Sequence, residues 1–358
     1  MTHEKVRGPH HAARVYLRFL FGVLALAIIP LLVNVVVDPL WYFAGNQLGP
    51  NYPFNERISK ANLLAGSELD YDCLVLGSSR TTLLNVDEIQ GRRCFNFAVS
   101  QARFSDALAL ARYSQQRKLA AKSVIFALDG FNYSQALSHF QNPLPPFLLV
   151  GKSPPHVLTT YLSADAMAFS WKTLRHQAPN DRYYDSQFSA LALPGAGPFR
   201  PQRPLRAGSV VEVDRGFNQF SLGPFRYDPE LSQLRKLFPD AELIGYVPPV
   251  AAQYLAHLHL AGTLESYLRA LFESNRVFDR IYDFSIPSSV TRDANNTYDG
   301  SHFYAPANQM VARAVGDPPM PPYEAVELHQ ISFDSYQKRV QAAVLDYIHE
   351  VGVAQPAR

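Results

Sequence analysis

The sequence has little cysteine and no strong excess of charge of either sign, and each shortage excludes a class of protein. Only Cys73 and Cys94 occur among the 358 residues, too few for a small domain built on disulfides. Both lie in apolar, strand-like stretches, so we expect buried free thiols, although neighbouring strands would leave bridging open. The 33 basic and 31 acidic residues give a net charge of only +2. No basic stripe stands out beyond the N-terminus, so nucleic acid is not an expected partner.

Several common enzyme motifs are missing as well. The sequence contains no glycine-rich nucleotide-binding fingerprint, internal repeat or low-complexity tract. His257 and His259 have no carboxylate or third ligand beside them, so we expect no metal site there.

Charge is absent from one long segment near the N-terminus. No charged residue occurs from Phe19 to Val37, and a helix of this length rises about 28 Å, close to the hydrocarbon thickness of a bilayer. Arg14 and Arg18 precede the segment and Asp38 follows it. Since basic residues favour the cytoplasmic side, we predict a cytoplasmic tail at 1–14 and a transmembrane helix at 15–37. The alternative is a cleaved signal peptide, whose apolar stretch is shorter and ends in a small-x-small site.

Beyond a polar linker at 38–56, the chain alternates short apolar runs with helical stretches. A run of this kind that ends in glycine is typical of a buried parallel strand, and strands separated by helices predict right-handed crossovers. We therefore predict an α/β domain at 57–358, a flavodoxin-like three-layer sandwich with about five parallel strands. The strands are expected at Cys73–Leu76, from Cys94, from Ser123, at Glu242–Val247 and at Val277–Phe284.

The alternation breaks between about 133 and 227. This stretch is rich in proline and aromatic residues and is too long for a simple loop in a compact domain. We interpret it as an insertion over the carboxyl edge of the sheet, where ligands bind in this fold class.

A candidate nucleophile follows the first predicted strand, in the sequence Gly77-Ser78-Ser79-Arg80. A serine placed between a strand and a helix exposes its hydroxyl at the sheet edge, beside the N–H groups and positive dipole end of the helix. That arrangement suits acyl transfer. Taken alone the motif is weak, since a serine after a strand is more often a helix cap, and the G-x-S-x-G elbow is absent.

A candidate base follows the fifth predicted strand, in the sequence YDGSHFYAP. Asp299 precedes His302 by three residues, so one loop can present both side chains. If this loop reaches the edge where Ser79 lies, His302 can accept its proton and Asp299 can orient the imidazole. A surface histidine is the alternative interpretation.

Together these motifs resemble the first and last blocks of the SGNH (GDSL-like) hydrolase superfamily. The resemblance implies a catalytic triad of Ser79, Asp299 and His302, whose chemistry requires no metal or cofactor. The aspartate that usually precedes the serine is Ser78 here, as in a membrane-anchored branch in which LGSSR follows an upstream ERISK, here at 56–60. That branch resembles the alginate and cellulose O-acetylation proteins and the D-alanine transfer protein of teichoic-acid operons.

The resemblance also implies an oxyanion site. The third block maps onto Gly130-Phe131-Asn132, so the Asn132 amide and the Ser79 backbone N–H are the expected donors. The glycine of the second block is missing, because Gln101 and Ala102 occupy that stretch. Arg80 and Ser78 are candidate substrate-binding residues, although cations such as Arg80 more often form structural ion pairs.

The resemblance predicts a single-pass protein of the bacterial inner membrane with its main domain in the periplasm. It would be a serine O-acetyltransferase or acetylesterase acting on a cell-surface or exported polysaccharide, and a membrane-bound acyltransferase is an implied partner. The alternative is a non-catalytic scaffold or polymer-binding partner that keeps the fold. The missing second-block glycine favours the scaffold, and the retained triad favours the enzyme.

Overall fold

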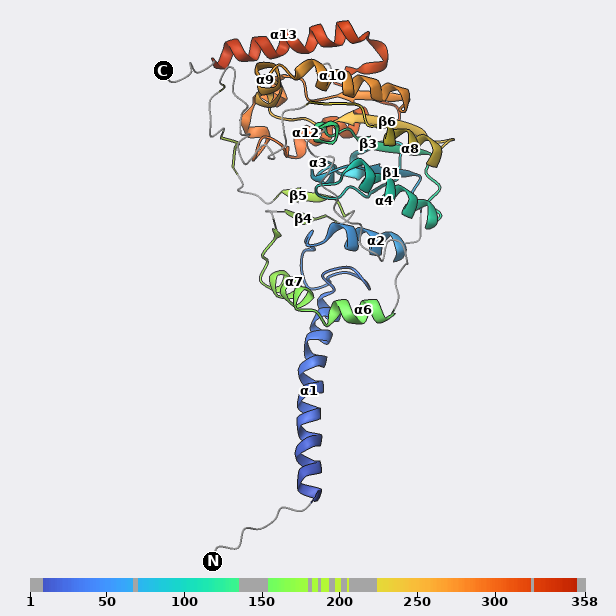
Figure 1. Cartoon of the computed structure of the whole chain (residues 1–358), viewed down its shortest axis with the longest axis vertical. Helices are drawn as coiled ribbons and strands as arrows, with labels where there is room; N and C mark the ends of the chain where they lie inside the picture. Colours follow the sequence, from blue (N-terminus) through green and yellow to red (C-terminus); the bar gives the residue numbers. More distant parts are fainter. Residues whose placement is uncertain are drawn as a thin grey trace, which may run out of the picture.

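The computed structural model describes residues 9–352, except for 67–69, 135–153, 180–181, 186–187, 193–196, 201–204, 206–223 and 323–324. Figure 1 shows an α/β domain with one long helix, α1 (Pro9–Val37), projecting from it. The helix α13 (Phe333–Val351) lies at the opposite end of the domain.

A six-stranded, mostly parallel sheet forms the centre of the domain. Its order is β2-β1-β3-β6-β7-β8, and only β8 (Val326–Glu327) runs antiparallel to its neighbour. The five parallel strands are β1 (Cys73–Leu76), β2 (Cys94–Asn96), β3 (Ser123–Ala127), β6 (Glu242–Val247) and β7 (Arg280–Asp283). The predicted mixed α/β fold and its five parallel strands are confirmed. The chain reverses direction across the sheet between β1 and β3, the position at which doubly wound sheets bind ligands.

Helices cover both faces of the sheet because successive strand residues point to opposite sides. Leu74, Val124 and Phe126 pack into one core, and the intervening Val75 and Ile125 pack into a second. Facing the first core are α2 (Glu56–Gly66), α4 (Phe104–Gln116), α8 (Ser232–Leu237), α9 (Ala252–Leu260), α10 (Leu264–Glu273) and α13. Facing the second are η1 (Val86–Glu88) and α12 (Ala305–Ala314). The domain is therefore a three-layer sandwich.

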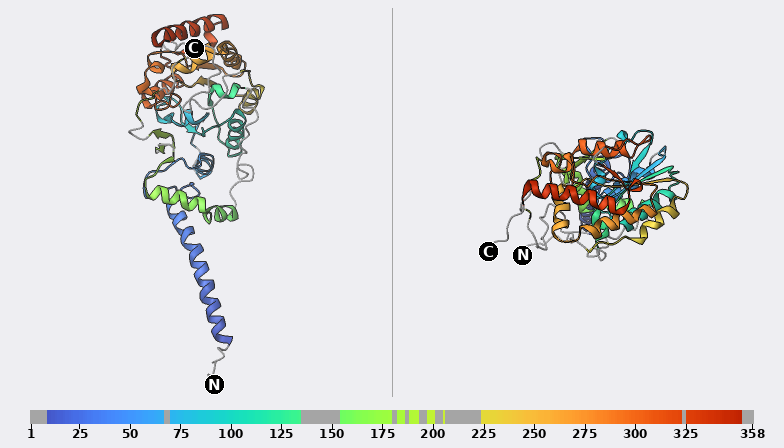
Figure 2. Two further views of the ribbon diagram at one scale, coloured as in Figure 1. Left: turned by 60° about the vertical axis from the view of Figure 1, so that its left-hand side comes forward. Right: turned by 90° about the horizontal axis from the view of Figure 1, so that it is seen from above.

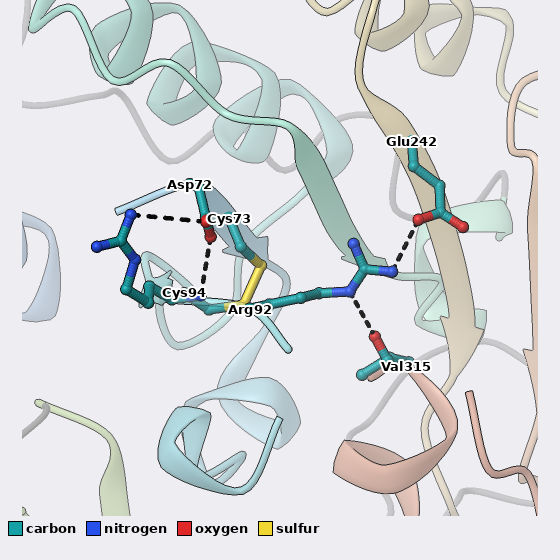
Figure 3. Close-up of a disulfide and its surroundings, with 7 residues drawn as sticks. Asp72, Cys73, Arg92, Cys94, Glu242 and Val315 are labelled. Atoms are coloured by element: carbon teal, nitrogen blue, oxygen red, sulfur yellow. Dashed lines mark hydrogen bonds and ion pairs between the residues drawn. A yellow bond between two sulfur atoms is a disulfide. The ribbon is translucent and has the colours of Figure 1, made fainter. Parts of the chain in front are cut away.

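The prediction of free thiols is wrong, because Cys73 and Cys94 form a disulfide. These residues are direct partners in the register of β1 and β2, and their Cα atoms lie 4.1 Å apart. The apolar pattern of each run indicates a strand but does not fix which residues face each other across the pair. Figure 3 shows the bond beside Arg92, which reaches across to Glu242 at 2.7 Å.

The segment predicted as a linker, 38–56, is folded against the domain. Asp38 has a φ of 46° and ends α1, and its carboxylate accepts hydrogen bonds from the backbone amides of Tyr42, Phe43 and Gly45. The hydroxyl of Tyr161 donates to the same carboxylate. Within the predicted linker, these side chains satisfy the backbone of a compact turn.

The described part of the insertion contains two helices and a hairpin. The helices α6 (Pro154–Tyr161) and α7 (Ala164–Leu174) lie beside the end of α1 (Figures 1 and 2). The hairpin of β4 (Arg182–Tyr184) and β5 (Ala190–Ala192) lies between these two helices and the six-stranded sheet. Only the hairpin follows the prediction of an insertion at the carboxyl edge, since α6 and α7 pack against α1. The segments 135–153 and 206–223 fall outside the described residues.

The disulfide should stabilise the domain by restricting the unfolded chain. The two cysteines are 21 residues apart, and chain-entropy arguments for a loop of this size give about 3 kcal/mol. We expect a reducing agent to lower the free energy of unfolding in urea by this order. The Cys73→Ala/Cys94→Ala variant is the matched control and should not respond to the reductant. An equal response in the variant would assign the effect to something other than the bond.

Candidate active site

Ser79 begins the short helix α3 (Ser79–Thr82), directly after β1. Gly77 makes the tight connection possible, because a β-carbon there would lie 2.3 Å from Thr81 Oγ1 and 2.7 Å from the Ala127 side chain. Ser78 is the N-cap of α3. The Ser79 side chain is thereby held at the carboxyl edge of the sheet, where it is partly exposed.

The structure brings the three predicted triad side chains together. Ser79 Oγ lies 2.8 Å from His302 Nε2, and His302 Nδ1 lies 2.6 Å from Asp299 Oδ2. Ser79 and His302 are 223 residues apart in the chain, so the fold alone creates this contact. With Nδ1–H donated to Asp299, Nε2 is the free acceptor for the serine hydroxyl.

The loop carrying Asp299 and His302 is fixed by its own hydrogen bonds. Asp299 Oδ1 accepts from the backbone amides of Ser301 at 2.9 Å and His302 at 2.7 Å. Thr297 Oγ1 donates to the His302 carbonyl and accepts from the Gly300 amide. Gly300 has a φ of 79°, a conformation that favours glycine. The carboxylate therefore orients the imidazole with one oxygen and shapes the turn with the other.

The environment of His302 keeps its imidazole neutral. Burial lowers the pKa of His302 below 6.5; the hydrogen bond with Asp299 opposes this effect, and the positive charge of Arg182 adds to it. The ring of Tyr298 is stacked on the imidazole, with centroids 5.6 Å apart. At neutral pH the ring can therefore accept a proton from Ser79.

Asp299 remains ionised beside it. Burial acts to raise the pKa of Asp299, but hydrogen bonds from the His302 ring and from the Ser301 and His302 amides outweigh burial and lower the pKa below 3.8. A carboxylate next to a neutral imidazole is the resting state that a general base requires.

Sequence reasoning missed Arg182, which lies in the insertion on β4 and is 5% exposed. Its guanidinium donates to the Ser79 carbonyl at 3.4 Å and to Thr82 Oγ1 at 3.3 Å. It also donates to the Tyr298 hydroxyl at 3.1 Å. Arg182 thus joins the helix that carries Ser79 to the tyrosine stacked on His302. No local signal in the sequence singles out one arginine in a segment whose fold is unpredictable.

The two candidate substrate-binding residues have structural contacts. Ser78 is 1% exposed, and its hydroxyl caps α3 by accepting from the Arg80 amide. Arg80 pairs with the buried Asp129 at 2.8 Å and donates to Ser301 Oγ at 2.9 Å and to its carbonyl at 3.2 Å. Arg80 therefore joins the loops after β1, β3 and β7, and Ser78 is too buried to meet a substrate.

The predicted oxyanion residues lie at the same edge. Asn132 belongs to η2 (Gly130–Tyr133), just after β3, and its amide donates to the Ala102 carbonyl at 3.4 Å. Gln101, at the place of the missing glycine, has a φ of 59°, so its backbone adopts the left-handed conformation that glycine favours. Among the described residues, the backbone N–H groups of Ser79 and Gln101 donate to no protein acceptor. Two unpaired amides are thus available at this edge, and Asn132 keeps a second side-chain N–H beyond the one donated to Ala102.

Side chains of helix α2 hold the segments that follow β1 and β2. Glu56 accepts a hydrogen bond from the Ser100 amide, and Lys60 donates to Asn96 Oδ1 at 3.4 Å. Asn96 in turn donates to the carbonyls of Thr81 and Leu84. Burial lowers the pKa of Lys60 to about 8, and the nearby Glu56 opposes this effect. The Glu56–Lys60 segment therefore holds the chain after β2 and the end of α3.

Comparison with known proteins adds little to this geometry. No family model matches the chain, and no curated protein matches it. A solved structure from Streptococcus pneumonia, described as "a putative platelet activating factor", is 9% identical over 79% of this chain and 93% of that chain, with a TM-score of 0.34. So distant a likeness carries no argument about function. Within the described residues, no group of three or more histidine, cysteine, aspartate or glutamate side chains could hold a metal ion.

The positive charge of Arg182 should contribute measurably to the low pKa of His302. We expect Arg182→Gln to raise the pKa of His302 toward 6.5, because it removes a charge that opposes the imidazolium. Arg182→Lys keeps the charge and should leave the pKa closer to that of the wild type. Titration of the His302 ring by NMR measures the shift. An identical pKa in the wild type and the Gln variant would show that the charge of Arg182 does not affect it.

Proposed function

We propose that this chain is a membrane-anchored serine acyl-transfer enzyme of the SGNH (GDSL-like) hydrolase type, with a flavodoxin-like domain. The observation that carries the proposal is His302, whose two ring nitrogens contact Ser79 at 2.8 Å and Asp299 at 2.6 Å. A structural histidine has no need of a reactive hydroxyl on one nitrogen and a carboxylate on the other. Nucleophilic catalysis needs both.

In the first step Ser79 Oγ attacks the carbonyl carbon of an acyl ester, and His302 Nε2 takes the hydroxyl proton. The carbonyl oxygen becomes an oxyanion, which the Ser79 and Gln101 amides and the Asn132 side chain would stabilise. The C–O bond to the leaving alcohol then breaks, and His302 returns the proton to that alcohol. The product is an acyl ester on Ser79.

In the second step an acceptor hydroxyl attacks the acyl-serine and gives its proton to His302. Collapse of the second oxyanion breaks the bond to Ser79 Oγ, which recovers a proton from His302. A sugar hydroxyl as acceptor makes the enzyme a transferase, and water makes it an esterase. Asp299 stays ionised throughout and orients the ring.

The proposed place of action is the periplasmic face of the bacterial inner membrane. Helix α1 contains a stretch, Ala13–Val37, that is long and apolar enough to cross a membrane, although a signal sequence passes the same test. The disulfide supports an oxidising compartment, since such bonds are rare in the cytosol. By resemblance to the O-acetylation proteins, the proposed substrate is an envelope polysaccharide, with a membrane-bound acyltransferase as a candidate partner. Tethering would raise the effective concentration of the domain at the membrane.

The first test is covalent labelling of the full-length chain with a fluorophosphonate, together with hydrolysis of p-nitrophenyl acetate. Ser79→Ala should abolish labelling and lower kcat by about 10³-fold or more, because no other group can replace the nucleophile. The variant should fold normally, since the only hydrogen bond of the Ser79 hydroxyl in the described structure is with His302.

Ser78→Ala is the matched control. It removes the cap of α3 and should cost about 1 kcal/mol of stability, but it should still be labelled at Ser79. A correctly folded wild type that is inert to both reagents would overturn the proposal of an enzyme. It would favour the alternative, a scaffold that binds polymer without catalysis.

A second test concerns the acceptor. With p-nitrophenyl acetate as donor, we expect added alginate or cellulose oligosaccharides to become acetylated, because their hydroxyls compete with water for the acyl-serine. Mass spectrometry of the oligosaccharides measures the transfer, and Ser79→Ala gives the background. Free acetate as the sole product, at a rate that the oligosaccharides do not change, would identify an esterase.

A further inference from the structure

Exposed apolar side chains gather at one end of the domain. Beyond α1, the large apolar side chains that the described residues expose are Phe43, Leu48, Leu158, Leu162, Trp171, Leu174, Met320, Leu345 and Val351. The first six lie on α6, directly after it, on α7 and in the turn after α1, and we call these six the collar. Single exposed apolar residues are common, but a group of them marks an interaction surface.

The collar residues are neighbours in the fold. Leu158 and Leu162 are four residues apart and Trp171 and Leu174 three apart, spacings that place each pair on one helical face. The Phe43 ring lies 6.0 Å from that of Tyr161, at the end of α6. Gly49, next to Leu48, lies against His176, just beyond α7. The collar therefore follows both helices beside α1 (Figures 1 and 2).

The length of α1 determines how far the collar lies from the bilayer that α1 would cross. Its uncharged run, Phe19–Val37, rises about 28 Å, nearly the full hydrocarbon thickness. Leu31 and Val35, within this run, pack against a buried cluster that includes Tyr161 of α6 and Ala166 of α7. Asn34, also within it, is buried and hydrogen-bonded to Ser170 and to the Tyr161 carbonyl. If α1 spans the bilayer, α6 and α7 must lie at the membrane boundary.

We propose that the collar is seated in the interfacial layer of the same bilayer that α1 crosses. Trp171 at 58% exposure is the residue type that membrane interfaces favour, and the Arg175 guanidinium lies 5.1 Å from its ring centroid. Lys172, on α7, and Arg175, just after it, are exposed, and such side chains can reach lipid headgroups while their methylene stems stay on apolar surface. Lipid is the one partner that continues the apolar surface of α1 without a break.

This proposal rests on the membrane-spanning orientation of α1 and not on acyl transfer. Its experiment therefore measures lipid contact and protease protection, which do not depend on Ser79. Inactivity of the protein toward esters would leave the result unaffected.

The test uses the two tryptophans of the chain, Trp41 and Trp171. Full-length Trp41→Phe protein, in nanodiscs whose lipids carry bromine near the glycerol end of the acyl chain, reports on Trp171 alone. We expect about a twofold loss of its emission relative to unbrominated lipid, because an interfacial side chain lies within about 5–10 Å of the headgroup–acyl boundary. Subtracting the emission of Trp171→Phe from that of the wild type, in each lipid, gives the quenching of Trp171 without altering Trp41.

The matched control is Leu345→Trp in a chain lacking both native tryptophans. Leu345 is 51% exposed but lies on α13, at the far end of the domain (Figure 1), so its replacement should not be quenched. Protease protection of the N-terminal tail in sealed vesicles, lost when detergent opens them, checks that α1 spans. Unquenched Trp171 in a spanning protein would overturn the proposal. Quenching that disappears when each disc holds two copies of the protein would also overturn it, because the collar would then contact the second copy and not lipid. Cleavage of α1 as a signal peptide would overturn it as well.

Discussion

The chain has to bring a serine after the first strand and a histidine after the fifth parallel strand to one point, and this requirement shapes the domain. Parallel strands end at a common edge, but β3 and β6 separate β1 from β7. With about 4.8 Å between neighbouring strands, the ends of β1 and β7 lie about 14 Å apart, beyond the reach of two side chains. The segment 284–302, with α11 (Ser289–Arg292) and η7 (Ala294–Asn296), covers that distance and returns His302 to Ser79.

Buried polar contacts hold the loops that meet at this edge. Arg80 joins the loops after β1, β3 and β7 through Asp129 and Ser301. Lys60 binds Asn96, at the end of β2, which in turn binds the segment after β1. Buried charges are costly unless they are hydrogen-bonded, so these groups constrain the geometry even where they add little stability. Unlike these buried polar groups, the backbone amides of Ser79 and Gln101 have no acceptor among the described residues. They remain available as donors where the proposed reaction develops negative charge.

Much of this fold was predictable, because its signals are local. Each parallel strand is a short apolar run, and β6 has the bounds that its run predicts, Glu242–Val247. The triad was predictable because Gly-x-Ser and Asp-x-x-His follow strands of one sheet. The disulfide, Arg182 and the folded turn after α1 were not, since each depends on a register or on contacts between distant segments. The strand β8, with two residues, is too short to leave a pattern.

The insertion links the membrane end of the domain to the candidate catalytic edge. Its helix α7 contacts the last turns of α1 through Ser170, and Arg182, eight residues beyond Leu174, contacts the carbonyl of Ser79. The Tyr184 amide, on the same strand as Arg182, donates to the Asn51 carbonyl at 2.8 Å, so the turn after α1 is joined to β4. In the proposed orientation Ser79 therefore stands at a fixed height above the bilayer. A rigid connection of this kind would confine the proposed reaction to acyl donors and polymer segments that reach that height, whereas a flexible tether would let the site search a volume.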